Sequence, residues 1–373
     1  MIRFGVVALG LLAGCPKSGD PYCEDLQQIA SKPSSASDPL RLGYHFTSYA
    51  LSISGLANGG VIVPMCSGLA TLDATGKESK RIETDQAINV ATGPGDTIYA
   101  VTRKPIDHTV TAASPDGTVR WQMPALDVDQ VFGSVDGVYA EAFVFPTADN
   151  PDSQSSIVMY DAATGARRTV VPGNTAQNAV GAGPGGGVIT EEEAATSVTL
   201  RQLDATGAAK WTSIATGTGP RVRGAAATPD GGVIVFGDAQ SALDLGGLTI
   251  AKTSAGFVSF IAGLDAHGVA QWGYQLDTSV TAIAIAPNGD ALLLGGNGVG
   301  LTVTRARSTG VVGQLTLPDR RSIDQLGIVP AGDGAVWLQV SLFDDEDSPD
   351  PVRLQIGDHT FTDTGYYLFQ LGV

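Results

Sequence analysis

A glycine-rich turn followed by a short run of β-branched residues recurs seven times along this chain. Two clear copies are Asn58-Gly59-Gly60 before Val61 and Asp230-Gly231-Gly232 before Val233, and the others begin at Pro94, Asp136, Pro184, Pro287 and Gly332. Turn residues placed directly before a β-branched run predict a hairpin that enters a buried strand. Glycine supplies 48 of the 373 residues, about twice its usual share, which argues against a mainly helical fold.

A second recurring segment is a strand that ends in an Asp-x-x-Gly turn, often with tryptophan four residues beyond the glycine. The tryptophan copies end at Trp121, Trp211 and Trp272, whereas the copies at Asp73–Gly76, Asp161–Gly165 and Arg307–Gly310 lack it. An aspartate side chain accepts hydrogen bonds from backbone amides two residues on, and glycine permits a positive φ. We therefore expect tight turns, with the tryptophan packed where successive sheets meet.

The two segments together predict an all-β fold, a seven-bladed β-propeller. Residues 40–373, shared among seven copies, give about 48 residues per copy, which suits a four-stranded blade. The last expected strand, Tyr366–Leu371, is followed only by Gly372 and Val373, so the seventh blade lacks its outermost strand. The spare segment Leu42–Thr47 precedes the first blade turn. We expect the N-terminal strand to close the ring on the last blade, with Tyr44 in the place of the tryptophan.

These residues resemble two bacterial repeat families. The Leu-Asp-Ala-x-x-Gly-x-x-x-Trp segment is similar to the repeats of quinoprotein (PQQ-type) propellers, and residues 237–272, which contain Leu243–Leu248, resemble the SBBP repeat more closely. A partial copy of that repeat begins at Leu354. The resemblance implies architecture rather than activity. Quinoprotein dehydrogenases carry adjacent cysteines, which this chain lacks, so no cofactor is expected.

The N-terminus is typical of an export signal. Arg3 precedes the apolar run Phe4–Gly14, which is too short to span a bilayer. Leu12-Ala13-Gly14-Cys15 resembles the bacterial lipoprotein box, which implies that residues 1–14 are a signal peptide and that the Cys15 thiol carries the lipid anchor. An ordinary signal peptide with an incidental cysteine is the alternative. Pro16, rather than aspartate, after the cysteine favours the outer membrane of the cell envelope.

Residues 15–39 are rich in Pro, Ser and Asp, which predicts a flexible tether, with one or two helical turns within Glu24–Ala30. With Cys15 lipidated, Cys23 and Cys66 form an even pair in an oxidising compartment, so we expect a disulfide between them. Two unpaired thiols are the alternative, since spacing alone does not decide.

Composition and motifs exclude several kinds of site. The 38 acidic and 22 basic residues give a net charge of −16, the wrong sign for binding nucleic acid or an anionic membrane surface. Gly181–Gly186 matches G-x-G-x-x-G but precedes a strand rather than a helix. The histidines are too widely spaced for a zinc motif, and no Gly-x-Ser-x-Gly elbow occurs. The four histidines are His45, His108, His267 and His359. His267 is expected to be a solvated turn residue.

Two acidic runs are interpreted as solvated. Asp344–Asp350 offers oxygen ligands for calcium but lacks the alternate spacing and the turn glycine of a preformed loop, so an inter-strand loop is favoured. Glu191–Glu193 predicts a charged strand end that discourages edge pairing. No metal site is therefore expected.

The predicted function is that of a non-catalytic binding or scaffold module, which holds a protein or glycan on one face of a monomeric disc. A lipoprotein propeller of similar repeat type serves the bacterial outer-membrane assembly machine, which supports this class by analogy. The alternative is an enzyme, such as a lyase, hydrolase or cofactor-dependent dehydrogenase, with a central-channel site not assigned from the sequence. A surface coat without a specific ligand is a third possibility.

Replacing Cys15 by serine tests the anchor. Because only the thiol accepts the diacylglycerol, the Cys15→Ser protein should incorporate no labelled fatty acid and should leave the membrane fraction. A Cys66→Ser protein should still be lipidated. Labelled lipid on the Cys15→Ser protein would contradict the assignment.

Overall fold

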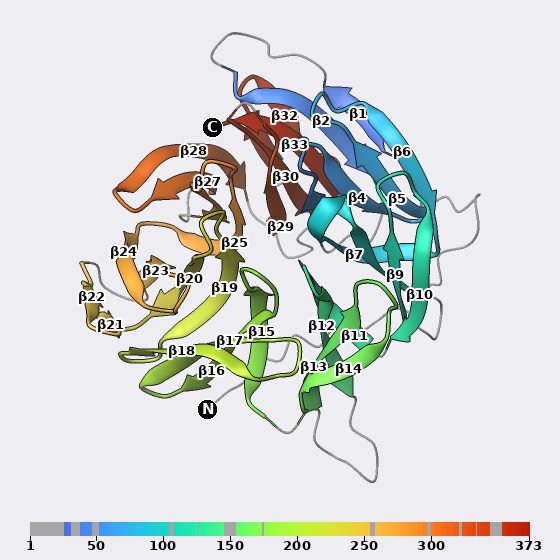
Figure 1. Cartoon of the computed structure of the whole chain (residues 1–373). Helices are drawn as coiled ribbons and strands as arrows, with labels where there is room; N and C mark the ends of the chain where they lie inside the picture. Colours follow the sequence, from blue (N-terminus) through green and yellow to red (C-terminus); the bar gives the residue numbers. More distant parts are fainter. Residues whose placement is uncertain are drawn as a thin grey trace.

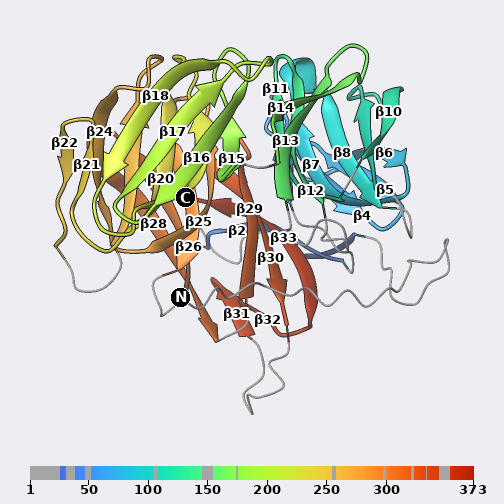
Figure 2. The same cartoon turned by 90° about the horizontal axis from the view of Figure 1, so that it is seen from below.

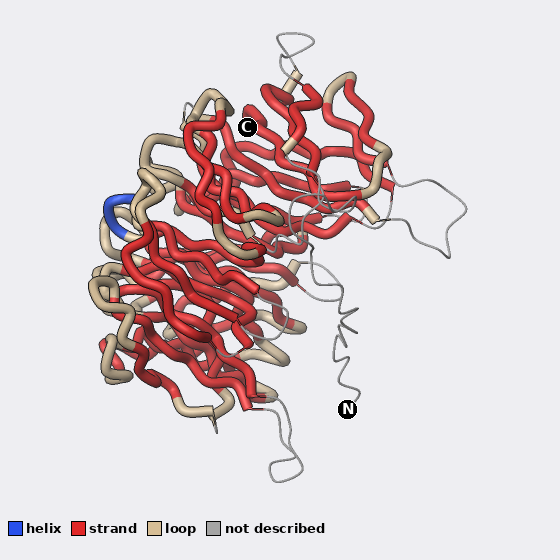
Figure 3. Tube along the Cα trace, turned by 90° about the vertical axis from the view of Figure 1, so that its right-hand side faces the viewer, coloured by secondary structure: helices blue, strands red, loops and turns tan. Residues whose placement is uncertain are grey.

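The computed structural model describes residues 26–30, 38–46, 52–103, 108–125, 127–144, 154–173, 175–253, 258–296, 300–320, 323–332, 334–343 and 353–373. These residues form antiparallel sheets, with one 3-10 turn, η1 (Pro94–Asp96), as the helical element among them (Figure 3). The sheets stand as seven blades around a central axis (Figure 1). The prediction of a seven-bladed β-propeller is confirmed.

Each blade begins with a strand near the axis, and its later strands lie farther out. The first three blades, in order from the axis, contain β3 (Ser54–Gly55), β4 (Val61–Met65), β5 (Gly68–Leu72) and β6 (Glu78–Glu83); β7 (Gln86–Thr92), β8 (Ile98–Arg103), β9 (His108–Ala113) and β10 (Val119–Ala125); and β11 (Asp127–Ser134), β12 (Gly137–Val144), β13 (Gln154–Asp161) and β14 (Arg167–Val171).

Blades 4 and 6 have six strands and blade 7 has five. Blades 4 to 7 contain β15 (Gln177–Ala182), β16 (Val188–Ala194), β17 (Ser197–Leu203), β18 (Ala209–Thr216), β21 (Leu243–Leu245) and β22 (Leu248–Ile250); β19 (Arg221–Ala227), β20 (Val233–Ala239), β23 (Val258–Leu264) and β24 (Ala270–Leu276); β25 (Ser279–Ile285), β26 (Ala291–Gly296), β27 (Gly300–Arg307), β28 (Gly310–Arg320), β31 (Arg353–Ile356) and β32 (His359–Phe361); and β29 (Ile323–Pro330), β30 (Ala335–Leu342), β33 (Gly365–Gly372), β2 (Leu40–Phe46) and β1 (Gln27–Ala30).

Both recurring segments form the turns that the sequence predicts. The glycine-rich segment joins the first and second strands of a blade: in blade 5 the Gly231 amide donates to the Thr228 carbonyl at 3.0 Å, with Gly231 at φ +88°. The Asp-x-x-Gly segment joins the third and fourth strands. In blade 4 the Asp204 carboxylate accepts from the amides of Thr206 at 2.8 Å and Ala208 at 3.0 Å.

Strand β2 closes the ring, as predicted. It pairs with β33 from Leu40↔Leu371 to Phe46↔Tyr366, and β33 pairs in turn with β30. The residues Leu40 and Phe46 have no exposed surface. The N-terminal part of the chain thus supplies the outer strand that the last repeat lacks.

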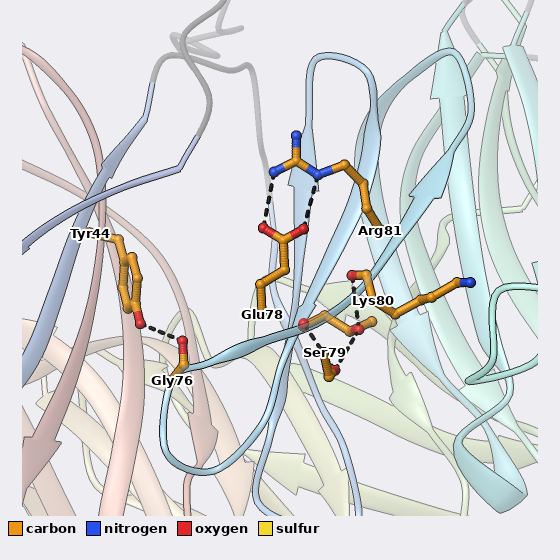
Figure 4. Close-up of polar contacts among 7 residues, drawn as sticks. Tyr44, Gly76, Glu78, Ser79, Lys80 and Arg81 are labelled. Atoms are coloured by element: carbon orange, nitrogen blue, oxygen red, sulfur yellow. Dashed lines mark hydrogen bonds and ion pairs between the residues drawn. The ribbon is translucent and has the colours of Figure 1, made fainter.

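Tyr44 also takes the role predicted for it. In blades 2 and 4 the tryptophan of the fourth strand covers the turn glycine of the next blade: a Cβ added to Gly165 would lie 2.8 Å from the ring of Trp121, and one on Gly268 would lie 2.6 Å from Trp211. Tyr44 lies against Gly76 of blade 1 in the same way, and its hydroxyl donates to the Gly76 carbonyl (Figure 4).

Two hairpins join neighbouring blades. Hairpin β21–β22 leaves blade 5 between its second and third strands and adds to the outer strand of blade 4, through Ala215↔Leu245. Hairpin β31–β32 leaves blade 7 and adds to blade 6 in the same manner (Figure 2). The leucines that mark both segments in the sequence, such as Leu245 and Leu354, are buried between blades.

The prediction of helical turns within Glu24–Ala30 is wrong for the part of that range that the structure describes. Gln27–Ala30 is strand β1 and pairs with β2. A helix this short is unstable alone, whereas the outer edge of β2 offers unpaired backbone groups, so strand pairing is favoured. In the described residues, no helix is both long and apolar enough to cross a membrane.

A Phe46→Ala substitution should destabilise the whole propeller. It leaves a cavity in the closing strand, and a buried Phe→Ala change costs about 3–5 kcal/mol. Urea unfolding followed by circular dichroism and by tryptophan fluorescence should show one transition at lower urea. The exposed Val312→Ala control should behave as the wild type. If circular dichroism retains a major transition at the wild-type midpoint, the effect is local and ring closure is not the controlling contact.

Candidate functional site

The first candidate site lies near the axis, at the turns between the first and second strands of blades 2 to 5. This turn-face depression has a volume of about 340 Å³. Its lining residues are Thr92, Gly93, Pro94, Gly133, Ser134, Val135, Ala182, Gly183, Pro184, Gly185, Ala227, Thr228, Pro229 and Gly231. Four successive blades therefore contribute to one surface.

The repeated turn sequence builds this surface. Pro94, Pro184 and Pro229 occupy matching positions in blades 2, 4 and 5, and Val135 takes that position in blade 3. Proline fixes φ, and backbone hydrogen bonds close the turns: the Gly183 amide donates to Gly187 at 3.0 Å, and the equivalent bond in blade 5 is 2.9 Å long. The Val135 side chain is 53% exposed. The rim is thus apolar and largely preformed.

The described lining residues carry no ionisable side chain. Two of their hydroxyls are occupied, since Thr92 donates to the Gly55 carbonyl at 3.0 Å and Thr228 donates to Asp230. Ser134 differs, because it is only 5% exposed and its hydroxyl has no hydrogen-bond partner among the described residues. A buried hydroxyl without a partner is unfavourable, so a ligand that bonds to it gains free energy.

The second candidate site contains Glu191, toward the opposite end of the inner strands of blades 4 and 5. The prediction of a charged strand end that discourages edge pairing is wrong: Glu191–Glu193 lie within β16, which pairs with both β15 and β17. Glu191 is 3% exposed. The Asn178 amide donates to Glu191 Oε1 at 2.7 Å, while Oε2 is buried without a partner among the described residues.

Burial raises the pKa of Glu191 to about 7, and this desolvation is its largest influence. The hydrogen bond from Asn178 lowers the pKa, the charges of Glu193 and Glu141 raise it, and that of Arg221 lowers it. A carboxyl that titrates near neutrality in a protein interior is a candidate functional group.

Two ion pairs from blade 5 lie at the same end of the inner strands. The Arg223 guanidinium contacts Asp238 through Nε at 2.9 Å and Nη2 at 2.7 Å. Arg221 Nε lies 3.5 Å from Glu193 Oε2. Within each of these two pairs the charges balance. The burial of Glu191 is not predictable from the sequence, because the three consecutive glutamates differ only in the neighbours that the fold places around them.

Cys66 and the four histidines, which the sequence analysis singled out, do not line the turn-face depression. Cys66 lies in the turn between β4 and β5, whereas Cys15, Cys23 and Asp344–Asp350 lie outside the described residues. The Cys23–Cys66 disulfide stays a prediction. Gly181 and Ala182 end β15, and the rest of the Gly181–Gly186 segment begins the turn into strand β16 rather than a helix, as expected.

The four histidines lie apart. His45 lies on β2, where Nε2 is 3.2 Å from the Thr364 carbonyl, and His108 begins β9. His267 is exposed in the Asp265 turn, as predicted, and His359 Nε2 lies 3.4 Å from Asp38. Across the described segments, no group of three or more His, Cys, Asp or Glu side chains could hold a metal ion.

No family model and no curated protein matches this chain. Among solved structures, it is similar to a chain of the mitotic checkpoint complex, at 13% identity and a TM-score of 0.54, with 94% of this chain and 99% of that chain covered. It is also similar to virginiamycin B lyase from Staphylococcus aureus (11% identity, TM-score 0.44, 94% and 99% covered) and to Drosophila Plexin A in complex with Semaphorin 1b (10%, 0.43, 94% and 88%). At these identities, the first similarity supports the propeller fold alone.

The Glu191→Gln substitution should stabilise the protein at pH 8 and have little effect at pH 4. The folded-state pKa of about 7 exceeds the ordinary value of 4.5, so wild-type stability falls as pH rises from about 4.5 to 7, and the penalty is complete above that window. The shift corresponds to at most about 3 kcal/mol. Urea unfolding at the two pH values measures it. Glu192→Gln, at a more exposed position, is the control; a Glu191→Gln effect that is the same at both pH values would contradict the raised pKa.

Proposed function

We propose that this protein is a lipid-anchored, non-catalytic binding module of the bacterial cell envelope. Its ligand is an uncharged, extended segment of a partner protein, held in the turn-face depression. The observation that supports this proposal is the lining itself: rigid turns from four blades meet there, and the lining residues described above carry no ionisable side chain.

This lining suits binding better than catalysis. General acid–base and nucleophilic catalysis require a titratable or activated group within hydrogen-bonding reach of the substrate. The depression instead offers the exposed rings of Pro94 and Pro229, the side chain of Val135 and turn backbone. Apolar contacts with a few polar groups are typical of pockets that fix a ligand's position. Among the hydroxyls of the lining, that of Ser134 is buried and has no hydrogen-bond partner among the described residues.

The anchor completes the proposal. A lipid on Cys15 would attach the chain to the membrane, with the outer membrane favoured by Pro16. Since β1 begins at Gln27 and belongs to blade 7, residues 15–26 would link the lipid to the disc.

Site-specific photo-crosslinking tests the docking surface. A photoreactive phenylalanine analogue at Val135 should capture one envelope protein, identified by mass spectrometry as a linked peptide. The same analogue at Val311, which is 49% exposed on β28, should not capture it. Capture of the same protein from both positions would contradict the proposed surface, and linked glycan in place of peptide would contradict a protein ligand.

Introducing a charge at Val135 supplies the affinity measurement. Once the captured peptide is known, Val135→Asp should weaken its binding at least about tenfold, because an unpaired carboxylate would be desolvated on docking. Val311→Asp carries the same charge change at similar exposure and should bind as the wild type. Equal affinity in all three proteins would contradict the proposal.

A further inference from the structure

Two arginines of blade 6 share one buried carboxylate. Arg305 and Arg307 belong to β27, and Asp290 lies in the turn that joins β25 to β26. Arg305 Nε donates to Asp290 Oδ2 at 2.6 Å, and Arg307 Nη2 donates to the same oxygen at 2.8 Å. None of the three residues lines the turn-face depression, so this cluster is independent of the proposed function.

Strand pairing places both arginines on one face of blade 6. Leu292 of β26 pairs with Arg305, and Leu292 packs with Val303 in the apolar cluster between blades 6 and 7. Because side chains alternate along a strand, Arg305 and Arg307 lie on the same face of β27 as Val303. Both arginine side chains therefore extend from the face of β27 that is turned toward blade 7, at the end nearest the first–second turn.

The carboxylate of Asp290 is held in place and ionised. Its side chain is 6% exposed, whereas the side chains of Arg305 and Arg307 are 28% and 44% exposed. The Asn288 amide donates to Asp290 Oδ2 at 3.0 Å. Burial raises the pKa of Asp290, but the hydrogen bonds from both arginines and from Asn288 lower it, so that the pKa lies below its ordinary value. At neutral pH the carboxylate therefore carries its charge.

The cluster keeps one uncompensated positive charge, because two guanidiniums face a single carboxylate. Within the described part of the chain, neither arginine side chain forms another hydrogen bond or ion pair. A guanidinium has five N–H donors, so each arginine retains several that are unused. Arg223 of blade 5 provides the contrast: it pairs with Asp238 alone, through Nε at 2.9 Å and Nη2 at 2.7 Å, and the two charges balance.

We propose that Arg305 and Arg307 together bind a carboxylate anion on the blade 7 side of β27. Guanidinium N–H groups form charge-assisted, two-point hydrogen bonds with planar carboxylates. Because Asp290 already holds both arginine side chains, little of their conformational entropy remains to be lost when the ligand binds. One monoanion also neutralises the remaining positive charge.

Other anions fit this cluster less well. A phosphate dianion would leave the site with a net negative charge, which the chain's net charge of −16 makes unfavourable. Chloride carries a single charge but is spherical, so it does not match the planar fork of a guanidinium as a carboxylate does. The net charge of the chain opposes every anion, so we expect a Kd on the order of 1 mM for a small carboxylate.

Nuclear magnetic resonance of the arginine Nε–H groups in the full chain tests the site. Titration with N-acetylglycine should move the signals of Arg305 and Arg307 saturably and leave that of Arg223 unchanged. N-Acetylglycinamide, which lacks the carboxylate, should move none of them. Sodium chloride should produce the same shift only at a concentration at least about tenfold higher. Acetate distinguishes the sources of the carboxylate: an affinity equal to that of N-acetylglycine indicates a free acid, and a weaker one indicates the end of a peptide.

Arg307→Gln leaves one guanidinium on Asp290, so the cluster becomes neutral and binding at Arg305 should weaken at least about tenfold. Arg223→Gln is the matched control, since it removes the same charge from a side chain of similar exposure, 51%. It should bind N-acetylglycine as the wild type does, and circular dichroism checks that both variants are folded. Equal losses in the two variants would show a general effect of charge and overturn the site. Equal potency of chloride, or the absence of a saturable shift in the wild type, would overturn it as well.

Discussion

The pairing of β2 with β33 is the interaction on which the rest of the ring depends. Every blade packs against two neighbours, so an open ring would leave the apolar faces of blades 1 and 7 in water. The pairing joins residues more than 300 positions apart, from Leu40 to Leu371. Loop-closure entropy grows slowly with length, and buried side chains such as Phe46 offset it.

Closure also brings together contacts that repeat around the ring. The fourth strand of one blade covers the third–fourth turn of the next, through Trp121, Trp211 and Tyr44 in three of the blades. At the inner edge, the Trp337 indole donates to the Gly59 carbonyl at 3.1 Å and so joins blade 7 to a first–second turn of blade 1. These contacts hold neighbouring blades together at their turns, on the outer side through the aromatic rings and on the inner side through the Trp337 indole.

The sequence predicted those parts of the fold that depend on local chemistry. Glycine at positive φ and aspartate at a turn act within a few residues, so both turns were predictable, as was the sevenfold recurrence of the glycine-rich one. Ring closure followed from counting strands. The added hairpins and β1 were not predicted, because their partners belong to other blades or other parts of the chain. The same reason hides the candidate sites: Glu191 and Ser134 are distinguished by burial, which depends on neighbours far away in sequence.

The two hairpins that pair with a neighbouring blade make some of the contacts between blades stronger than others. Hairpin β21–β22 joins blades 4 and 5 by backbone pairing, and β31–β32 joins blades 6 and 7. Among the described strands, blades 2 and 3 share no such ladder with each other or with blade 4. Backbone amides in the joined pairs should therefore exchange hydrogen together, as cooperative units, whereas the seams beside blade 3 open more readily. The turn-face depression spans both kinds of seam, so small rotations of blade 3 would change its width while the 4–5 pair remains a fixed wall.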